Sequence, residues 1–186
     1  MEKGLKLISF TGAQSSGKST LLEKCKKELP GKWLFVDEVT RLVKRKYGVS
    51  INEQGDDTTQ LLILNGHIEN TCLLNTIDDS YDGIILDRCI VDGLVYTEWL
   101  YDHGKVSKWV YEYALEVYQL LVSKLDIIFY TDPNIPLEDD GERSINIDFR
   151  NSIIDKFNRV NGHLCKYNIL KGDVCDRFNK ILKCVA

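Results

Sequence analysis

The sequence has no apolar run approaching the roughly 20 residues that a membrane-spanning helix requires. Its first residues, Met1-Glu2-Lys3-Gly4, lead into a short apolar stretch and do not resemble a secretory signal peptide. Its six cysteines form no C-x-x-C pair, and no group of Cys and His has the spacing of zinc ligands. These absences argue against a membrane protein and a zinc-finger class. They favour a cytoplasmic location, with reduced cysteines that serve as small core residues.

No repeat, low-complexity tract or linker rich in proline, glycine or serine divides the chain of 186 residues. That length suits one domain with its own hydrophobic core, so we expect residues 1–186 to form a single domain. The net charge of −4 gives the chain no general attraction for nucleic acid or an anionic membrane. Basic residues gather at 24–27 and 41–46, but nearby acidic residues favour solvated helix faces over a nucleic-acid patch.

Short apolar stretches alternate with longer helical patterns along the whole chain. The predicted strands are residues 5–11, 33–36, 83–87, 127–131 and 167–170. The predicted helices are residues 18–29, 38–47, 58–75, 89–103, 105–123, 149–160 and 174–185. In the third helix, the spacing of Leu61, Leu64, Ile68 and Cys72 predicts one buried face. This alternation predicts a parallel sheet covered on both faces, with ligands bound beyond the carboxyl ends of the strands.

A phosphate-binding loop follows the first predicted strand. Its eight residues match G-x-x-x-x-G-K-[ST] without departure: Gly12, Ala13, Gln14, Ser15, Ser16, Gly17, Lys18 and Ser19. The glycines allow a tight turn that directs backbone N–H groups at phosphate oxygens. We expect Lys18 to reach the β- and γ-phosphates of ATP and Ser19 to bind Mg²⁺. The pattern predicts a three-layer α/β/α P-loop NTPase fold, with strand order 2-3-1-4-5 and a small lid near residues 134–148.

Acidic residues follow two other predicted strands. Asp87 ends the apolar strand at 83–87, as a Walker-B aspartate does, and is a second candidate for holding Mg²⁺. Asp37 and Glu38 follow the strand at 33–36, and either could accept a proton from an acceptor hydroxyl. The alternative is structural, with Asp37 capping the next helix and Glu38 pairing with Arg41. Which of the two acids acts as a base stays open.

The polar segment after the fourth predicted strand contains Asp139-Asp140-Gly141-Glu142-Arg143. An arginine in such a segment could neutralise charge that develops during phosphoryl transfer. Gln60 is a weaker candidate, since its amide could meet a base edge or simply lie at the surface. His67, His103 and His163 have no partners at metal-ligand spacing, and we interpret them as surface or boundary residues.

Taken together, these motifs resemble the NadR-type P-loop kinases along the whole chain. The matching elements are the P-loop, the E-x-x-R pattern at Glu38 and Arg41, Asp87-Arg88 with Asp92, residues 139–143, and a closing Gly172…Arg177-Phe178 helix. The resemblance implies that Arg88 contacts acceptor or phosphate and that Arg143 closes over ATP. It also implies acceptor-binding roles for Arg41 and Asp92 and a cofactor-binding role for Gly172.

A looser resemblance links the chain to deoxynucleoside kinases, which carry an acid after strand two and acid-Arg-Ser after strand three. Asp37 and Asp87-Arg88-Cys89 match this only in part, because Cys89 replaces serine. Both families phosphorylate nucleoside hydroxyls, so the resemblance implies an ATP-dependent kinase with a nucleoside-like acceptor.

Two other functions remain as alternatives. A phage-type kinase could act on 5-hydroxymethyluracil within DNA, or on another nucleic-acid hydroxyl. A GTPase or ATPase switch is the third, but the chain has no N-K-x-D guanine motif and no ABC-type signature. The oligomeric state is left open.

Overall fold

A computed structural model describes residues 4–134, 146–162 and 164–185. Five parallel strands form one sheet in the order β2-β3-β1-β4-β5, which confirms the predicted order. The strands are β1 (Lys6–Thr11), β2 (Trp33–Val36), β3 (Gly83–Asp87), β4 (Ile127–Thr131) and β5 (Asn168–Leu170). The lid expected near residues 134–148 falls mostly outside the described ranges.

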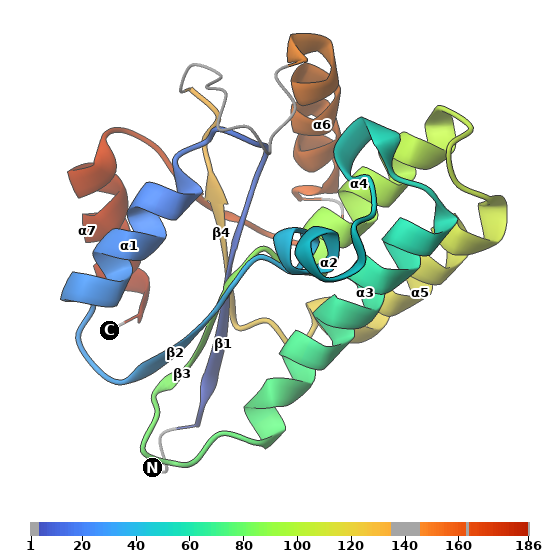
Figure 1. Cartoon of the computed structure of the whole chain (residues 1–186). Helices are drawn as coiled ribbons and strands as arrows, with labels where there is room; N and C mark the ends of the chain where they lie inside the picture. The colour runs from blue at the N-terminus through green and yellow to red at the C-terminus, as the bar shows by residue number, and fades with distance from the viewer. Residues whose placement is uncertain (1–3, 135–145, 163, 186) are drawn as a thin grey trace.

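Helices cover both faces of this sheet, as Figure 1 shows. The helices are α1 (Lys18–Glu28), α2 (Val39–Tyr47), α3 (Asp57–Cys72), α4 (Ile90–Asp102), α5 (Lys108–Val122), α6 (Ile147–Val160) and α7 (Val174–Val185). Short 3-10 turns, η1 (Asn52–Gln54) and η2 (Leu73–Asn75), lie before and after α3. Among the described residues, no helix combines the length and apolar character needed to cross a membrane.

The hydrophobic core lies in two layers, one on each side of the sheet. Ile8, Phe10 and Ile85 point to the layer under α1 and α7, whereas Leu7 and Ile84 point to the layer under α3, α4, α5 and α6. Successive side chains of a strand point to opposite faces, so strands buried on both faces must be apolar throughout. This accounts for the short uninterrupted apolar stretches in the sequence, and it confirms the three-layer α/β/α arrangement.

The predicted boundaries hold to within a few residues. The largest changes are three residues each: α3 ends at Cys72 and gives way to the turn η2, and α5 begins at Lys108 and not at 105. Helix α6 begins two residues earlier than expected. The side chain of Asn146 accepts hydrogen bonds from the N–H groups of Asp148 and Phe149, at 3.0 and 3.1 Å. This cap satisfies N–H groups at the start of α6, where no preceding helical turn exists.

The prediction for the buried face of α3 was partly wrong. Leu64 is buried, but Cys72 is exposed, and the stripe includes the polar residues Gln60 and His67. The expectation that the cysteines are small core residues holds for Cys25 and Cys89, which are buried. Cys72 and Cys175 are exposed, and Cys165 and Cys184 are partly buried. All six are free thiols.

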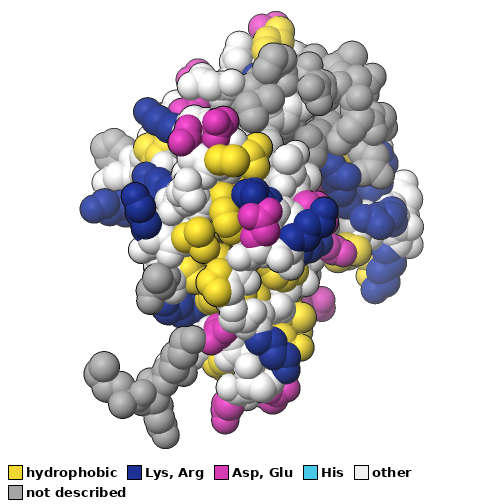
Figure 2. Space-filling view, turned by 90° about the vertical axis from the view of Figure 1, so that its left-hand side faces the viewer, with side chains coloured by type: hydrophobic (Ala, Val, Ile, Leu, Met, Phe, Trp, Pro, Cys, Tyr) yellow, Lys and Arg dark blue, Asp and Glu magenta, His cyan; other side chains and the backbone are white. Residues whose placement is uncertain are grey.

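Lys24, Lys26 and Lys27 of α1 lie among acidic neighbours on a solvated face. Lys24 pairs with Glu28 at 2.7 Å, and Lys26 pairs with Glu23 at 2.9 Å. Figure 2 views this side of the molecule, where side chains of both charges are interspersed around a band of hydrophobic ones. These pairs agree with the interpretation of residues 24–27 as a solvated helix face.

Phe157 offers a direct test of this packing, because its side chain is fully buried and its ring lies 5.6 Å from that of Tyr130. We expect Phe157→Ala to lower the free energy of unfolding by about 3–5 kcal/mol, measured by urea denaturation. The control is Leu120→Ala, since Leu120 is 60% exposed, and its effect should stay within about 0.5 kcal/mol. Equal effects in the two variants would contradict the assignment of this core layer.

Candidate functional site

The candidate residues gather where β1, β2 and β3 end. The P-loop follows β1, Asp37 and Glu38 follow β2, and Asp87 and Arg88 stand at the end of β3. Because these strands are parallel neighbours, their carboxyl ends meet along one edge of the sheet. Segments far apart in the sequence therefore form one site.

The P-loop connects β1 to α1 through backbone conformations that favour glycine. Gly12 has φ 136° and Gly17 has φ 81°. A Cβ atom at Gly12 would lie 2.7 Å from Thr131 Oγ1, so no other residue fits there without displacing β4. The glycines of the motif are thus required by both conformation and close approach.

Lys18 folds back over the loop. Its ammonium donates to the carbonyl oxygens of Gly12 and Ala13, both at 2.8 Å, and to Ser16 Oγ at 3.2 Å. Burial, followed by the charge of Arg88, lowers the pKa of Lys18 to about 7. The lysine is therefore held at the loop in a poorly solvated position, where an anionic group would stabilise its charge.

Two buried arginines brace the P-loop from the other side. Arg177 of α7 donates to the carbonyl oxygens of Ser16, Gly172 and Asp132 at 2.8, 2.9 and 3.2 Å. Arg150 of α6 donates to the carbonyls of Gln14 and Ser15 at 3.1 and 3.3 Å, and to that of Pro133 at 2.7 Å.

The sequence signalled Arg177 only through the closing Gly172…Arg177-Phe178 pattern, and it gave no role to Arg150 as a brace. The carbonyl oxygen of Gly172 accepts a hydrogen bond from Arg177, which also donates to Ser16 of the P-loop. Its expected role in cofactor binding stays a prediction.

Arg88 is the central cation of the site. Its guanidinium donates to Glu38 Oε1 at 2.7 Å, to Asp92 Oδ1 at 2.6 Å and to the Gly12 carbonyl at 3.1 Å. Its backbone has φ 72°, an uncommon conformation for a residue with a side chain. Burial alone would lower the pKa of Arg88, but the charges of Glu38, Tyr96 and the nearby aspartates raise it well above its usual value.

Glu38 and Asp37 occupy different positions, although they are adjacent in sequence. Glu38 Oε2 accepts from Arg41 Nε at 3.1 Å while Oε1 accepts from Arg88, so the carboxylate is held between two arginines. Asp37 is exposed and lines a cleft of about 660 Å³, open to solvent, beside Ser19 and Asp87. Glu38 lines that cleft as well.

Asp87 and Ser19 form a corner suited to a hard cation. Asp87 Oδ1 is buried and has no hydrogen-bond partner among the described residues. Burial, reinforced by the charge of Glu38, raises the pKa of Asp87 to about 6. Oxygen ligands of this kind fit Mg²⁺. In the described part of the chain, no group of three or more His, Cys, Asp or Glu side chains could hold a metal ion.

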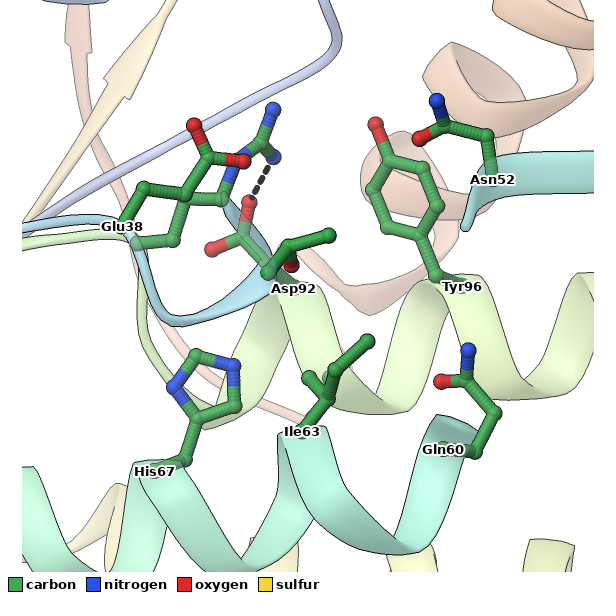
Figure 3. A pocket seen from close by; sticks show the side chains of 10 residues that line it. Glu38, Asn52, Gln60, Ile63, His67, Asp92 and Tyr96 are labelled. Atoms are coloured by element: carbon green, nitrogen blue, oxygen red, sulfur yellow. Dashed lines mark hydrogen bonds and ion pairs between the residues drawn. The ribbon is translucent and has the colours of Figure 1, made fainter. Parts of the chain in front are cut away.

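A second pocket lies next to this corner, between α3 and α4. The cavity within it has a volume of about 20 Å³, and Glu38, Arg88 and Asp92 line one end. Gln60, Ile63 and His67 project into it from α3, and Tyr96 from α4, as Figure 3 shows. Glu38 therefore borders both cavities.

Hydrogen bonds hold the polar side chains of this pocket, and one of them joins the pocket to the P-loop. The Tyr96 hydroxyl donates to Gln14 Oε1 at 3.1 Å, and burial raises the pKa of Tyr96 to about 12. Gln60 Oε1 accepts from Thr97 Oγ1 at 3.0 Å. Asp92 Oδ2 accepts from Thr11 Oγ1 at 2.6 Å, while its Oδ1 is bound to Arg88. Asp92 is thus engaged by protein groups on both oxygens, and its direct role in acceptor binding stays a prediction.

The sequence interpretation missed several residues of this pocket, among them His67 and Tyr96. His67 was expected at the surface or a boundary, but its side chain is 2% exposed. Tyr96 was given no role, and its position under the Arg88 guanidinium, 5.5 Å from the ring centroid, could not be inferred from spacing. His103 is exposed, as expected. Arg143 and His163 lie outside the described residues.

The fold and site define the class of protein: a P-loop nucleotide-binding α/β protein, with its phosphate loop between the first strand and first helix. The chain belongs to the AAA domain family, which it matches over residues 7–177. No curated protein matches it significantly in sequence.

Two kinds of solved structure have the same fold. The NadR protein in complex with NR has a TM-score of 0.75 at 18% identity, over 98% of this chain and 51% of that chain. The M. mycoides deoxyadenosine kinase with products dCMP and dCDP has a TM-score of 0.67 at 16% identity, over 95% and 96% of the two chains. The present chain therefore spans about half the length of NadR. The expected likeness to both families is confirmed at the level of fold.

His67 should make the protein sensitive to acid. Burial lowers the pKa of His67 to about 4, although Asp92 partly opposes this, and the ordinary value is 6.5. As the pH falls from 6.5 to 4, His67 binds a proton in the unfolded chain before it does so in the folded protein. The stability that neutral His67 confers is therefore complete above pH 6.5 and lost progressively toward pH 4, by about 3 kcal/mol in total.

The measurement is the free energy of unfolding in urea at several pH values, compared between the wild type and His67→Leu. The variant should lose less stability between pH 7 and pH 4.5, because it lacks this titrating group. Parallel profiles for the two proteins would show that His67 is not buried as a neutral imidazole.

Proposed function

We propose that this protein is an ATP-dependent phosphotransferase that moves the γ-phosphoryl group of ATP·Mg²⁺ to a hydroxyl of a nucleoside-like acceptor. One observation carries the proposal. Glu38 lies on the border between the cleft beside Ser19 and Asp87 and the pocket between α3 and α4. A carboxylate between a phosphate site and a second binding site is placed to accept a proton from a hydroxyl that attacks phosphorus.

In this mechanism the P-loop amides and Lys18 bind the phosphates of ATP. Ser19 and Asp87 hold Mg²⁺, which when bound neutralises charge on the phosphate oxygens. A bond forms between the acceptor oxygen and the γ-phosphorus, the bond from that phosphorus to the ADP oxygen breaks, and Glu38 takes the hydroxyl proton. Arg88 orients Glu38, and Arg41 and Arg143 supply further positive charge.

Glu38 is the better candidate for the base than Asp37. Asp37 is exposed and lines only the phosphate-side cleft, whereas Glu38 also lines the pocket where an acceptor would bind. Glu38 is also held by two arginines, Arg41 and Arg88. Their hydrogen bonds also fix its orientation.

The acceptor class is inferred from the pocket. Gln60 and Asn52 bring amides and Tyr96 brings an aromatic ring to this pocket. Small-molecule sites combine apolar walls with a few polar groups in this way. Structures of the same fold are described with NR in NadR and with dCMP in deoxyadenosine kinase. The small-molecule ligands of these neighbours favour a free nucleoside over a base within DNA.

A panel of acceptors tests the activity. The protein with ATP·Mg²⁺ should phosphorylate free nucleosides, and Lys18→Ala should lower the rate at least about 100-fold, because it removes a cation from the developing charge. The control is Lys27→Ala, an exposed change on the same helix, which should keep the wild-type rate. Phosphate transfer only to hydroxymethylated DNA would favour the polymeric acceptor. ATP hydrolysis indifferent to every acceptor would favour a switch.

The base is identified by two substitutions compared side by side. Glu38→Gln keeps the shape of the side chain but removes its ability to take a proton. It should lower kcat by about 100- to 10,000-fold with a modest change in KM. Asp37→Asn should lower kcat by less than about 10-fold. The assignment is reversed if Asp37→Asn has the larger effect on kcat.

A further inference from the structure

His67 is an unusual residue to find in the wall of a pocket. Its side chain is 2% exposed, and its Nδ1 atom has no hydrogen-bond partner among the described residues. In Figure 3 the ring projects from α3 beside Ile63, toward the space that Glu38 and Asp92 border. A buried polar atom left without a partner destabilises a protein by about 1–3 kcal/mol, so it calls for an explanation.

The neighbouring charged groups do not supply that explanation. Asp92 is already bound by Arg88 and Thr11, and Glu38 by Arg88 and Arg41. Their ionic partners are therefore complete without His67. A Cβ at Gly93 of α4 would lie 3.1 Å from the His67 ring, so α4 packs against the ring and limits its rotation. The imidazole is therefore held in place while its Nδ1 has no hydrogen-bond partner among the described residues.

We propose that His67 is a specificity-determining residue, whose imidazole forms a hydrogen bond with an uncharged polar group on the base of the acceptor. This inference rests on the proposed function and adds the chemistry by which the acceptor is chosen. Neutral imidazole has one donor and one acceptor nitrogen, so it can pair with an exocyclic amino group, a carbonyl oxygen or a ring nitrogen. Because neutral imidazole carries no charge, it does not attract a phosphate electrostatically. The low pKa of His67 agrees with this neutral form.

The strength of such selection follows from burial. An acceptor with a hydrogen in place of the polar group cannot form this hydrogen bond with His67. The imidazole then stays unpaired. Sites that hydrogen-bond a substrate group discriminate strongly against analogues that lack it. One such bond corresponds to a discrimination of about 10- to 100-fold in kcat/KM. Gln60, two helical turns earlier on the same face of α3, faces the pocket from farther along it.

The experiment uses pairs of nucleosides that differ by one polar group. Suitable pairs are adenosine with purine riboside, and cytidine with the pyrimidinone riboside that lacks its amino group. In at least one pair, wild type should prefer the member that carries the polar group by about 10-fold or more in kcat/KM, and His67→Met should bring that ratio to within about 3-fold of one. His67→Asn retains a donor and an acceptor and should preserve part of the preference. His103→Met is the matched control, because His103 is exposed, and should keep the wild-type ratio.

Two results separate the failure of this inference from the failure of the proposed function. If wild type phosphorylates nucleosides and His67→Met keeps its selectivity ratio unchanged, the specificity role is wrong and the activity stands. If wild type phosphorylates no nucleoside, both fall together. Should His67→Met not fold, His67→Leu and the dissociation constants of the nucleoside pairs, measured by titration calorimetry, decide the matter by the same ratio.

Discussion

The buried guanidinium of Arg88 is the interaction on which the site depends. It joins the end of β3 to Glu38 after β2, to Asp92 on α4 and to the Gly12 carbonyl of the P-loop. A cation this deeply buried is tolerated only because carboxylates and a carbonyl surround it. The same contacts compensate for its left-handed backbone conformation. One side chain thus connects the ends of the three strands.

The P-loop obeys a complementary constraint. A loop that turns its N–H groups inward must turn many carbonyl groups outward, and buried carbonyls need donors. Arg150 and Arg177, from two helices near the end of the chain, supply them for Gln14, Ser15 and Ser16. The last quarter of the chain is therefore part of the phosphate site, although its sequence carries no phosphate-binding motif.

Sheet order and element boundaries were predictable because apolar strands buried on both faces and a P-loop leave few arrangements. The strand-end residues Glu38, Asp87 and Arg88 were found for the same reason, since parallel strands bring their ends together. The pocket between α3 and α4 was not predictable in the same way. Helical periodicity indicates a buried face but not whether protein or ligand lies against it, so His67 was misplaced and Tyr96 overlooked. The lid arginine at position 143 stays a prediction.

The pocket wall on α3 has a further consequence for how this scaffold can diversify. Gln60, Ile63 and His67 occupy one face of a single helix, whereas the P-loop residues, the start of α1 and Asp87 lie at the ends of β1 and β3. Under the proposed function, substitutions on that helical face would alter which compound is accepted while leaving the transfer residues unchanged. Under the proposed function, acceptor specificity could therefore evolve through a few substitutions within this one short helix.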